Sequence, residues 1–209
     1  PNWRAMSNNS VDCSSVDDLP EQFWSGYSGD GEPYGLINLP LCRSHGRLAD
    51  GENYRPDWSV VGVNPCAEIT LANKEPCNLS EIMMPNIKSV EQFKEVAGLL
   101  YKACKTISCV GFSDPTTDEV VKQHHRLGIG VTGFMATSKW RNHKHLDAVY
   151  KHIEECDRNY SKQLGVPESI KLTTVKPSGT LSLLPDNCTP GMHAGFSRYL
   201  ILSLIHISE

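Results

Sequence analysis

The stretch "VGVNPCAEITLANKEPCNLSEI", Val61 to Ile82, is the part of this sequence that most constrains its interpretation. It holds two cysteines, Cys66 and Cys77, and Cys66 lies between Asn64 and Glu68 at two-residue spacing. In an extended segment side chains alternate, so we expect Asn64, Cys66 and Glu68 to project to one side. A carboxylate beside a thiol raises the pKa of the thiol. The pattern therefore disfavours a protease-type thiolate and favours chemistry that uses a neutral S–H with a base nearby.

Composition narrows the class of protein. The chain has 209 residues, 39% of them hydrophobic, and a formal net charge of -4, which suits one sizeable core and gives no basic surplus for nucleic acid. No signal-peptide pattern and no membrane-length apolar run occurs, so we expect no membrane partner. Eight scattered cysteines favour a reducing, cytoplasmic setting, in a bacterium or in the host of a phage. Because no C-x2-C pair and no H-E-x-x-H pattern occurs, we expect no metal site.

Helical and extended patterns alternate along the chain. Ser89 begins a Ser-Val-Glu-Gln capping box in front of apolar residues at helical spacing, and Gly165 ends another such pattern. The predicted elements are, in order, a strand at 59–63, helices at about 90–107, 117–126 and 145–164, and a strand at 169–175. This alternation predicts an α/β architecture.

A second motif, "TTVKPSGTLSLLP", runs from Thr173 to Pro185. A strand followed by Pro-Ser-Gly-Thr leaves free backbone N–H groups and two hydroxyls where a turn or helix begins, which favours an anion. A simple capped turn is the alternative. The candidate phosphate-binding residues are Lys176, Pro177, Ser178, Gly179 and Thr180.

The glycines from Gly128 to Gly133 fit the spacing G-x-G-x-x-G. They follow "VVKQHHR", a helical stretch, whereas a dinucleotide fingerprint requires a strand before its first glycine. We therefore do not expect a nicotinamide cofactor.

"EPCNLSEI" after "NPCAEI" resembles the active-site finger loop of ribonucleotide reductases, in the order and spacing of the adenosylcobalamin-dependent class (class II). "KPSGT", with "TPGMHAGFSRY" after it, is similar to the monomeric branch that uses ribonucleoside triphosphates. The resemblance implies reduction of ribonucleotides to 2'-deoxyribonucleotides for DNA synthesis, by a thiyl radical and with adenosylcobalamin as cofactor.

The same resemblance implies a role for each residue of the first motif. Cys66 would be the thiyl radical that takes the 3'-hydrogen of the ribose, and Glu68 the base on the 3'-hydroxyl. Asn64 would hold the substrate by hydrogen bonds. Cys77 would form a redox pair with a cysteine far upstream, which a thioredoxin-like reductant restores.

The family fold is a ten-stranded α/β barrel, and the resemblance implies that residues 1–201 are an internal part of it. The finger loop would span about 64–82 and the phosphate loop about 176–181. The allosteric region that binds a nucleotide effector and the C-terminal cysteines would lie outside, so we expect this fragment to be inactive by itself. Residues 202–209, "LSLIHISE", back-translate to a sequence like a transposase-type sequencing adapter, and we expect them to be non-native.

Two other interpretations stay open. The nearer one is a class I ribonucleotide reductase large subunit, which acts on diphosphates and takes its radical from a partner protein. The more distant one is a non-enzymatic module that uses its thiols structurally or to bind metal.

Overall fold

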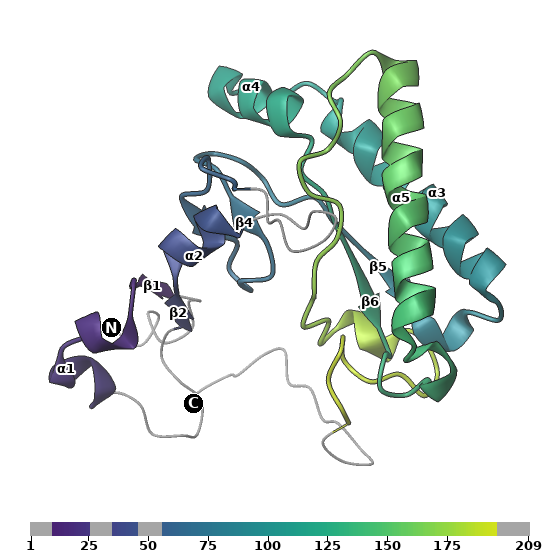
Figure 1. Cartoon of the computed structure of the whole chain (residues 1–209), viewed down its shortest axis with the longest axis horizontal. Helices are drawn as coiled ribbons and strands as arrows, with labels where there is room; N and C mark the ends of the chain where they lie inside the picture. Colours follow the sequence, from purple (N-terminus) through teal and green to yellow (C-terminus); the bar gives the residue numbers. More distant parts are fainter. Residues whose placement is uncertain (1–9, 26–34, 46–55, 196–209) are drawn as a thin grey trace, which may run out of the picture.

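The computed structural model describes residues 10–25, 35–45 and 56–195 (Figure 1). The strands are β1 (Ser10–Asp12), β2 (Gly35–Ile37), β3 (Gly62–Val63), β4 (Thr70–Leu71), β5 (Leu79–Met83) and β6 (Gly128–Thr132). The α-helices are α1 (Glu21–Trp24), α2 (Leu39–Ser44), α3 (Val90–Ser108), α4 (Pro115–His124) and α5 (His143–Leu164). Short 3-10 helices cover Val16–Asp18, Met84–Asn86, Ser138–Trp140 and Leu181–Leu183. The predicted α/β class is confirmed, and residues 202–209 lie outside the described part.

Two long helices, α3 and α5, form the main layer and lie side by side in Figure 1. The predicted start of α3 is confirmed, because the Ser89 hydroxyl accepts a hydrogen bond from the Gln92 N–H at 3.1 Å. Helix α5 ends as predicted at Gly165, which adopts the left-handed conformation at φ 68°. Apolar side chains from both helices fill the core between them, among them Phe93, Ala97, Tyr101, Val149 and Ile153.

Helix α4 differs from its prediction at both ends. It was expected over 117–126 but begins at Pro115, because Asp114 caps it by accepting from the N–H groups of Thr116 and Thr117. It stops at His124, because His125 takes a left-handed conformation at φ 44°. Arg126 is thereby released from the helix, and its side chain turns into the protein interior.

A parallel pair of strands, β5 and β6, supports the site. Leu79 to Met83 pair in register with Gly128 to Thr132, and Thr173 adds an isolated parallel bridge to Ile129. The strand predicted at 169–175 is thus reduced to one bridge beside β6. The segment from Gly128 to Gly133 follows α4, as expected, and Gly128 to Thr132 form a strand. No strand was predicted for β5, which occupies the end of the predicted finger loop.

The strand predicted at 59–63 is shorter than expected. Only Gly62 and Val63 pair, antiparallel to Leu71 and Thr70 of β4. The chain just before them turns instead of extending, because the Val60 N–H bonds to the Asp57 carbonyl at 3.3 Å. No helix in the described part of the chain combines the length and the apolar character needed to cross a membrane.

Gly133, which follows β6, is expected to be intolerant of a side chain. Its φ is 75°, and a Cβ there would lie 2.6 Å from Pro85 Cδ and 2.8 Å from Cys188 Sγ. Gly133→Ala should therefore lower the free energy of unfolding by about 2–4 kcal/mol, from backbone strain and overpacking together. Thermal unfolding of Gly133→Ala checks this prediction. Gly62→Ala is the control, since a Cβ at Gly62 meets nothing within 4 Å. Equal stability of the two variants would contradict the packing described.

Candidate active site

The segment that carries Cys66 is a tight turn. The Ala67 N–H bonds to the Asn64 carbonyl at 2.8 Å, and Ala67 adopts a left-handed φ of 57°. The expected extended arrangement of 64–68 is therefore wrong. Asn64, which is only 6% exposed, closes the turn: its side-chain oxygen accepts from the Ile69 N–H at 3.3 Å, and its own N–H bonds to the Ile69 carbonyl at 3.1 Å. Asn64 thus holds the backbone on both sides of Cys66.

Cys66 and Glu68 remain neighbours in this turn, although the backbone is not extended. Cys66 is exposed, and the Glu68 side chain is only 3% exposed. Partial burial raises the pKa of the Cys66 thiol, the negative charge of Glu68 raises that pKa further, and the Lys176 ammonium opposes them. The thiol is therefore protonated at neutral pH. The Lys176 ammonium lies 3.7 Å from Glu68 Oε1, and the Thr174 hydroxyl donates to the Glu68 carbonyl.

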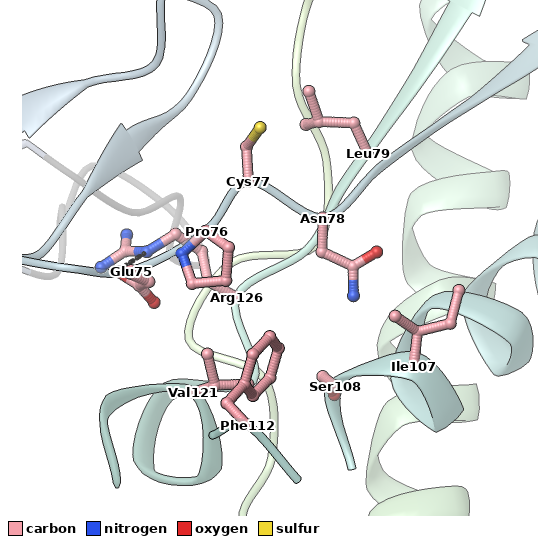
Figure 2. A pocket seen from close by; sticks show the side chains of 10 residues that line it. All are labelled: Glu75, Pro76, Cys77, Asn78, Leu79, Ile107, Ser108, Phe112, Val121 and Arg126. Carbon is pink, nitrogen blue, oxygen red and sulfur yellow. Dashed lines mark hydrogen bonds and ion pairs between the residues drawn. The ribbon is translucent and has the colours of Figure 1, made fainter. Parts of the chain in front are cut away.

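Cys77 is exposed at the edge of a pocket of about 320 Å³ (Figure 2). In the figure its thiol points away from Phe112 and Val121, which form the opposite end. Cys77 is close enough to Cys66 for its charge to raise the pKa of the Cys66 thiol slightly further. All the cysteines in the described residues are free, so the two thiols are not bonded to each other.

A buried ionic network anchors the chain just before Cys77. Arg126 donates to Glu75 Oε2 at 3.0 Å and to Asp57 Oδ2 at 2.6 Å, and all three side chains are at most 3% exposed. His124 contacts Glu75 Oε1 at 3.1 Å. Burial alone would raise the pKa of Glu75, but the bond with His124 and the charge of Arg126 outweigh it and lower that pKa. No motif in the sequence predicts this network, because it joins residues about 50 positions apart.

The predicted phosphate loop is a turn that leads into the 3-10 helix Leu181–Leu183. Ser178 has φ 54°, and its buried hydroxyl has no hydrogen-bond partner among the described residues. Gly179 and Thr180 are exposed. The Ser182 N–H bonds to the Ser178 carbonyl at 3.1 Å.

The "TPG" segment after this loop joins it to the end of β6. The Gly191 N–H donates to the Thr132 hydroxyl at 3.0 Å, and the Gly133 N–H donates to the Thr189 carbonyl at 2.8 Å. A Cβ at Gly191 would collide with the Lys176 carbonyl, so the two segments are in close backbone contact. The two sequence motifs therefore meet at Lys176, whose backbone belongs to one and whose ammonium contacts Glu68 of the other. No group of three His, Cys, Asp or Glu side chains suited to a metal ion forms within the described ranges.

Comparison with known proteins relates the sequence of this chain to a family. Residues 52–146 match the model of the ribonucleotide reductase barrel domain. The chain is 35% identical, over 95% of its length, to the adenosylcobalamin-dependent ribonucleoside-triphosphate reductases of Lactobacillus leichmannii and Lactobacillus delbrueckii subsp. bulgaricus. The chain belongs to the ribonucleotide reductase family.

The fold comparison agrees with this membership. A crystal structure of a B-12 dependent (class II) ribonucleotide reductase superposes with a TM-score of 0.73 and 31% sequence identity, over 88% of this chain and 29% of that one. The chain spans 31% of the length of the two Lactobacillus reductases. The strands β3 to β6 and the helices α3 and α4 lie within the residues that match the ribonucleotide reductase barrel domain.

Proposed function

We propose that this chain supplies the radical-bearing loop of an adenosylcobalamin-dependent enzyme that reduces ribonucleoside triphosphates to 2'-deoxyribonucleotides. One observation carries the proposal: the exposed Cys66 thiol, whose pKa is raised by burial and by Glu68, lies beside the buried carboxylate of Glu68. A thiol can give up a hydrogen atom only while it carries one, so the raised pKa of Cys66 suits radical chemistry and opposes thiolate chemistry. The proposed setting is the cytoplasm, where thiols stay reduced.

In this mechanism the cofactor, when bound, supplies the radical chemistry that takes the hydrogen atom from Cys66. The Cys66 sulfur is exposed in its turn, so it is accessible for giving up this hydrogen atom. It then removes the 3'-hydrogen of the ribose. Glu68 accepts the 3'-hydroxyl proton, which assists loss of the 2'-hydroxyl as water once the thiol pair that includes Cys77 has protonated it. Asn64 holds the turn through Ile69 and hydrogen-bonds the substrate.

The remaining proposed roles concern electrons and phosphate. Cys77 and a second cysteine supply the two protons and two electrons that convert the C2'–OH bond into C2'–H and water, and they end as a disulfide, which a thioredoxin-like dithiol reduces. Ser178, Gly179 and Thr180 bind the phosphates, supported by the buried unpartnered Ser178 hydroxyl and by the exposure of Gly179 and Thr180. Lys176 and Pro177 lead into this loop, and Lys176 adds positive charge. A nucleotide effector would act elsewhere in the full-length enzyme.

The full-length enzyme should form deoxyribonucleotide only when adenosylcobalamin is added. The measurement incubates it with a ribonucleoside triphosphate and a dithiol reductant, with and without the cofactor, and quantifies the 2'-deoxy product. Activity with diphosphates that needs a second protein in place of the cofactor would instead support the class I interpretation. Absence of product under every condition would support the non-enzymatic interpretation.

A further inference from the structure

Glu81 of β5 is a buried carboxyl group that the proposed mechanism does not use. Alternate residues of β5 and β6 point to opposite faces, and Ile82 and Ile129 lie on the face that packs into the core. Glu81 and its register partner Gly130 therefore belong to the opposite face. Lys176 lies on that face too, because it is the residue that a Cβ on Gly130 would meet.

Gly130 provides the space that brings Lys176 to this position. A Cβ on Gly130 would lie 3.1 Å from Lys176 Cδ and 3.2 Å from Lys176 Cγ. The aliphatic part of Lys176 thus crosses β6 at the residue paired with Glu81. Its ammonium continues to Glu68, where the Nζ to Oε1 distance is 3.7 Å, and the Lys176 side chain is only 13% exposed. The glycine at position 130 therefore lets the side chain of one lysine lie close to two carboxyl groups, those of Glu68 and Glu81.

Glu81 and Glu68 thus compete for a single cation. Both oxygens of Glu81 are buried, and neither has a hydrogen-bond partner among the described residues. Burial raises the pKa of Glu81, the charge of Glu68 raises that pKa further, and Lys176 opposes them without cancelling them. Among the described residues, the thiol of Cys188 also lies near Glu81, and burial raises the pKa of that thiol, so Cys188 brings no positive charge to this face.

We propose that Glu81 is a positioning residue that is held as a neutral carboxylic acid, which leaves the Lys176 ammonium to balance the charge of Glu68. Two buried carboxylates beside one ammonium would leave one negative charge uncompensated, and the proton goes to the member that lacks close contact with the cation. Glu68 contacts Lys176, whereas the Glu81 oxygens contact no donor in the part of the chain that the structure describes. The inference rests on the proposed function, in which Glu68 acts as the base.

The test compares Glu81→Gln, Lys176→Met and the wild type in the full-length enzyme. Infrared difference spectra of the resting protein at neutral pH detect the carbonyl band of a protonated carboxyl group, and this band should be lost in Glu81→Gln. Glu119→Gln is the matched control, because Glu119 is an exposed carboxylate on α4 and its removal should not affect the band. The spectra require no turnover, so they decide the protonation of Glu81 even if the proposed reaction fails.

The pH profile of kcat/KM provides the second readout. Lys176→Met removes the cation beside Glu68, so the acid limb should move up by about one pH unit. Glu81→Gln replaces one neutral group with another of the same shape, so its acid limb should stay within about 0.3 pH units of the wild type. An acid limb of Glu81→Gln that moves down by about one unit would mean that Glu81 is ionised in the wild type. That shift, or a protonated-carboxyl band that persists in Glu81→Gln, would overturn the inference.

Discussion

Cys66→Ser is expected to reduce deoxyribonucleotide formation by the full-length enzyme at least roughly a thousandfold, because it removes an interaction on which every turnover depends. A serine hydroxyl holds its hydrogen atom much more tightly than a thiol, so it cannot carry the radical. The fold should be unaffected, because Cys66 is exposed, and the free energy of unfolding should change by no more than about 0.5 kcal/mol. Product formation and thermal unfolding, measured on the same preparation, check both parts.

Cys109→Ser is the matched control for this substitution. Cys109 is a partly exposed cysteine at the C-terminal cap of α3, outside the proposed site, and its replacement should leave turnover close to that of the wild type. If instead Cys66→Ser lowers stability and leaves turnover intact, Cys66 has a structural role and the proposed mechanism is wrong.

Arg126→Met should have the largest effect on the stability of the segment from Asp57 to Glu75, which leads to Cys77. It leaves the Glu75 and Asp57 carboxylates buried without their shared cation, which typically costs about 3–5 kcal/mol. Native-state hydrogen exchange of the amides in 60–75 measures this local opening free energy directly. Lys122→Met is the control, since Lys122 pairs with Asp118 on the surface and its loss should cost no more than about 1 kcal/mol.

The effect of Arg126→Met should also depend on pH. Because the pKa of Glu75 is lowered in the folded protein, its ionisation stabilises the fold above the unfolded pKa of about 4.3, and this contribution is lost as pH falls. The variant lacks part of this contribution, so its difference from the wild type should narrow as pH falls below about 4.3. A difference that is independent of pH would contradict the ionic account of Arg126.

The two long helices, α3 and α5, could be predicted because their signals are local. Ser89 caps α3 and Gly165 ends α5, and the apolar spacing between such residues needs no knowledge of distant contacts. The strands could not be predicted in the same way. β5 is a strand because it pairs with β6, about fifty residues later in the chain, and its sequence resembles a continuation of the preceding loop.

The site residues also fall into two groups: local spacing predicts the position of some, and the position of others depends on contacts that are distant in sequence. The two-residue spacing predicts that Cys66 and Glu68 project to the same side, and the structure keeps them adjacent although the backbone turns between them. The position of Lys176 depends on the absence of a side chain at Gly130, which no pattern within the lysine motif reveals. The burial of His124 and Arg126 likewise depends on Glu75, which lies far away in sequence.

The central claim is that Cys66 removes hydrogen from C3' of a ribonucleotide, and the most direct test is a substrate deuterated at that carbon. The full-length enzyme, supplied with adenosylcobalamin and a dithiol, should convert the deuterated ribonucleoside triphosphate more slowly than the unlabelled one, and Cys66→Ser should convert neither. Equal rates for the two substrates, together with product formation by Cys66→Ser, would contradict the account.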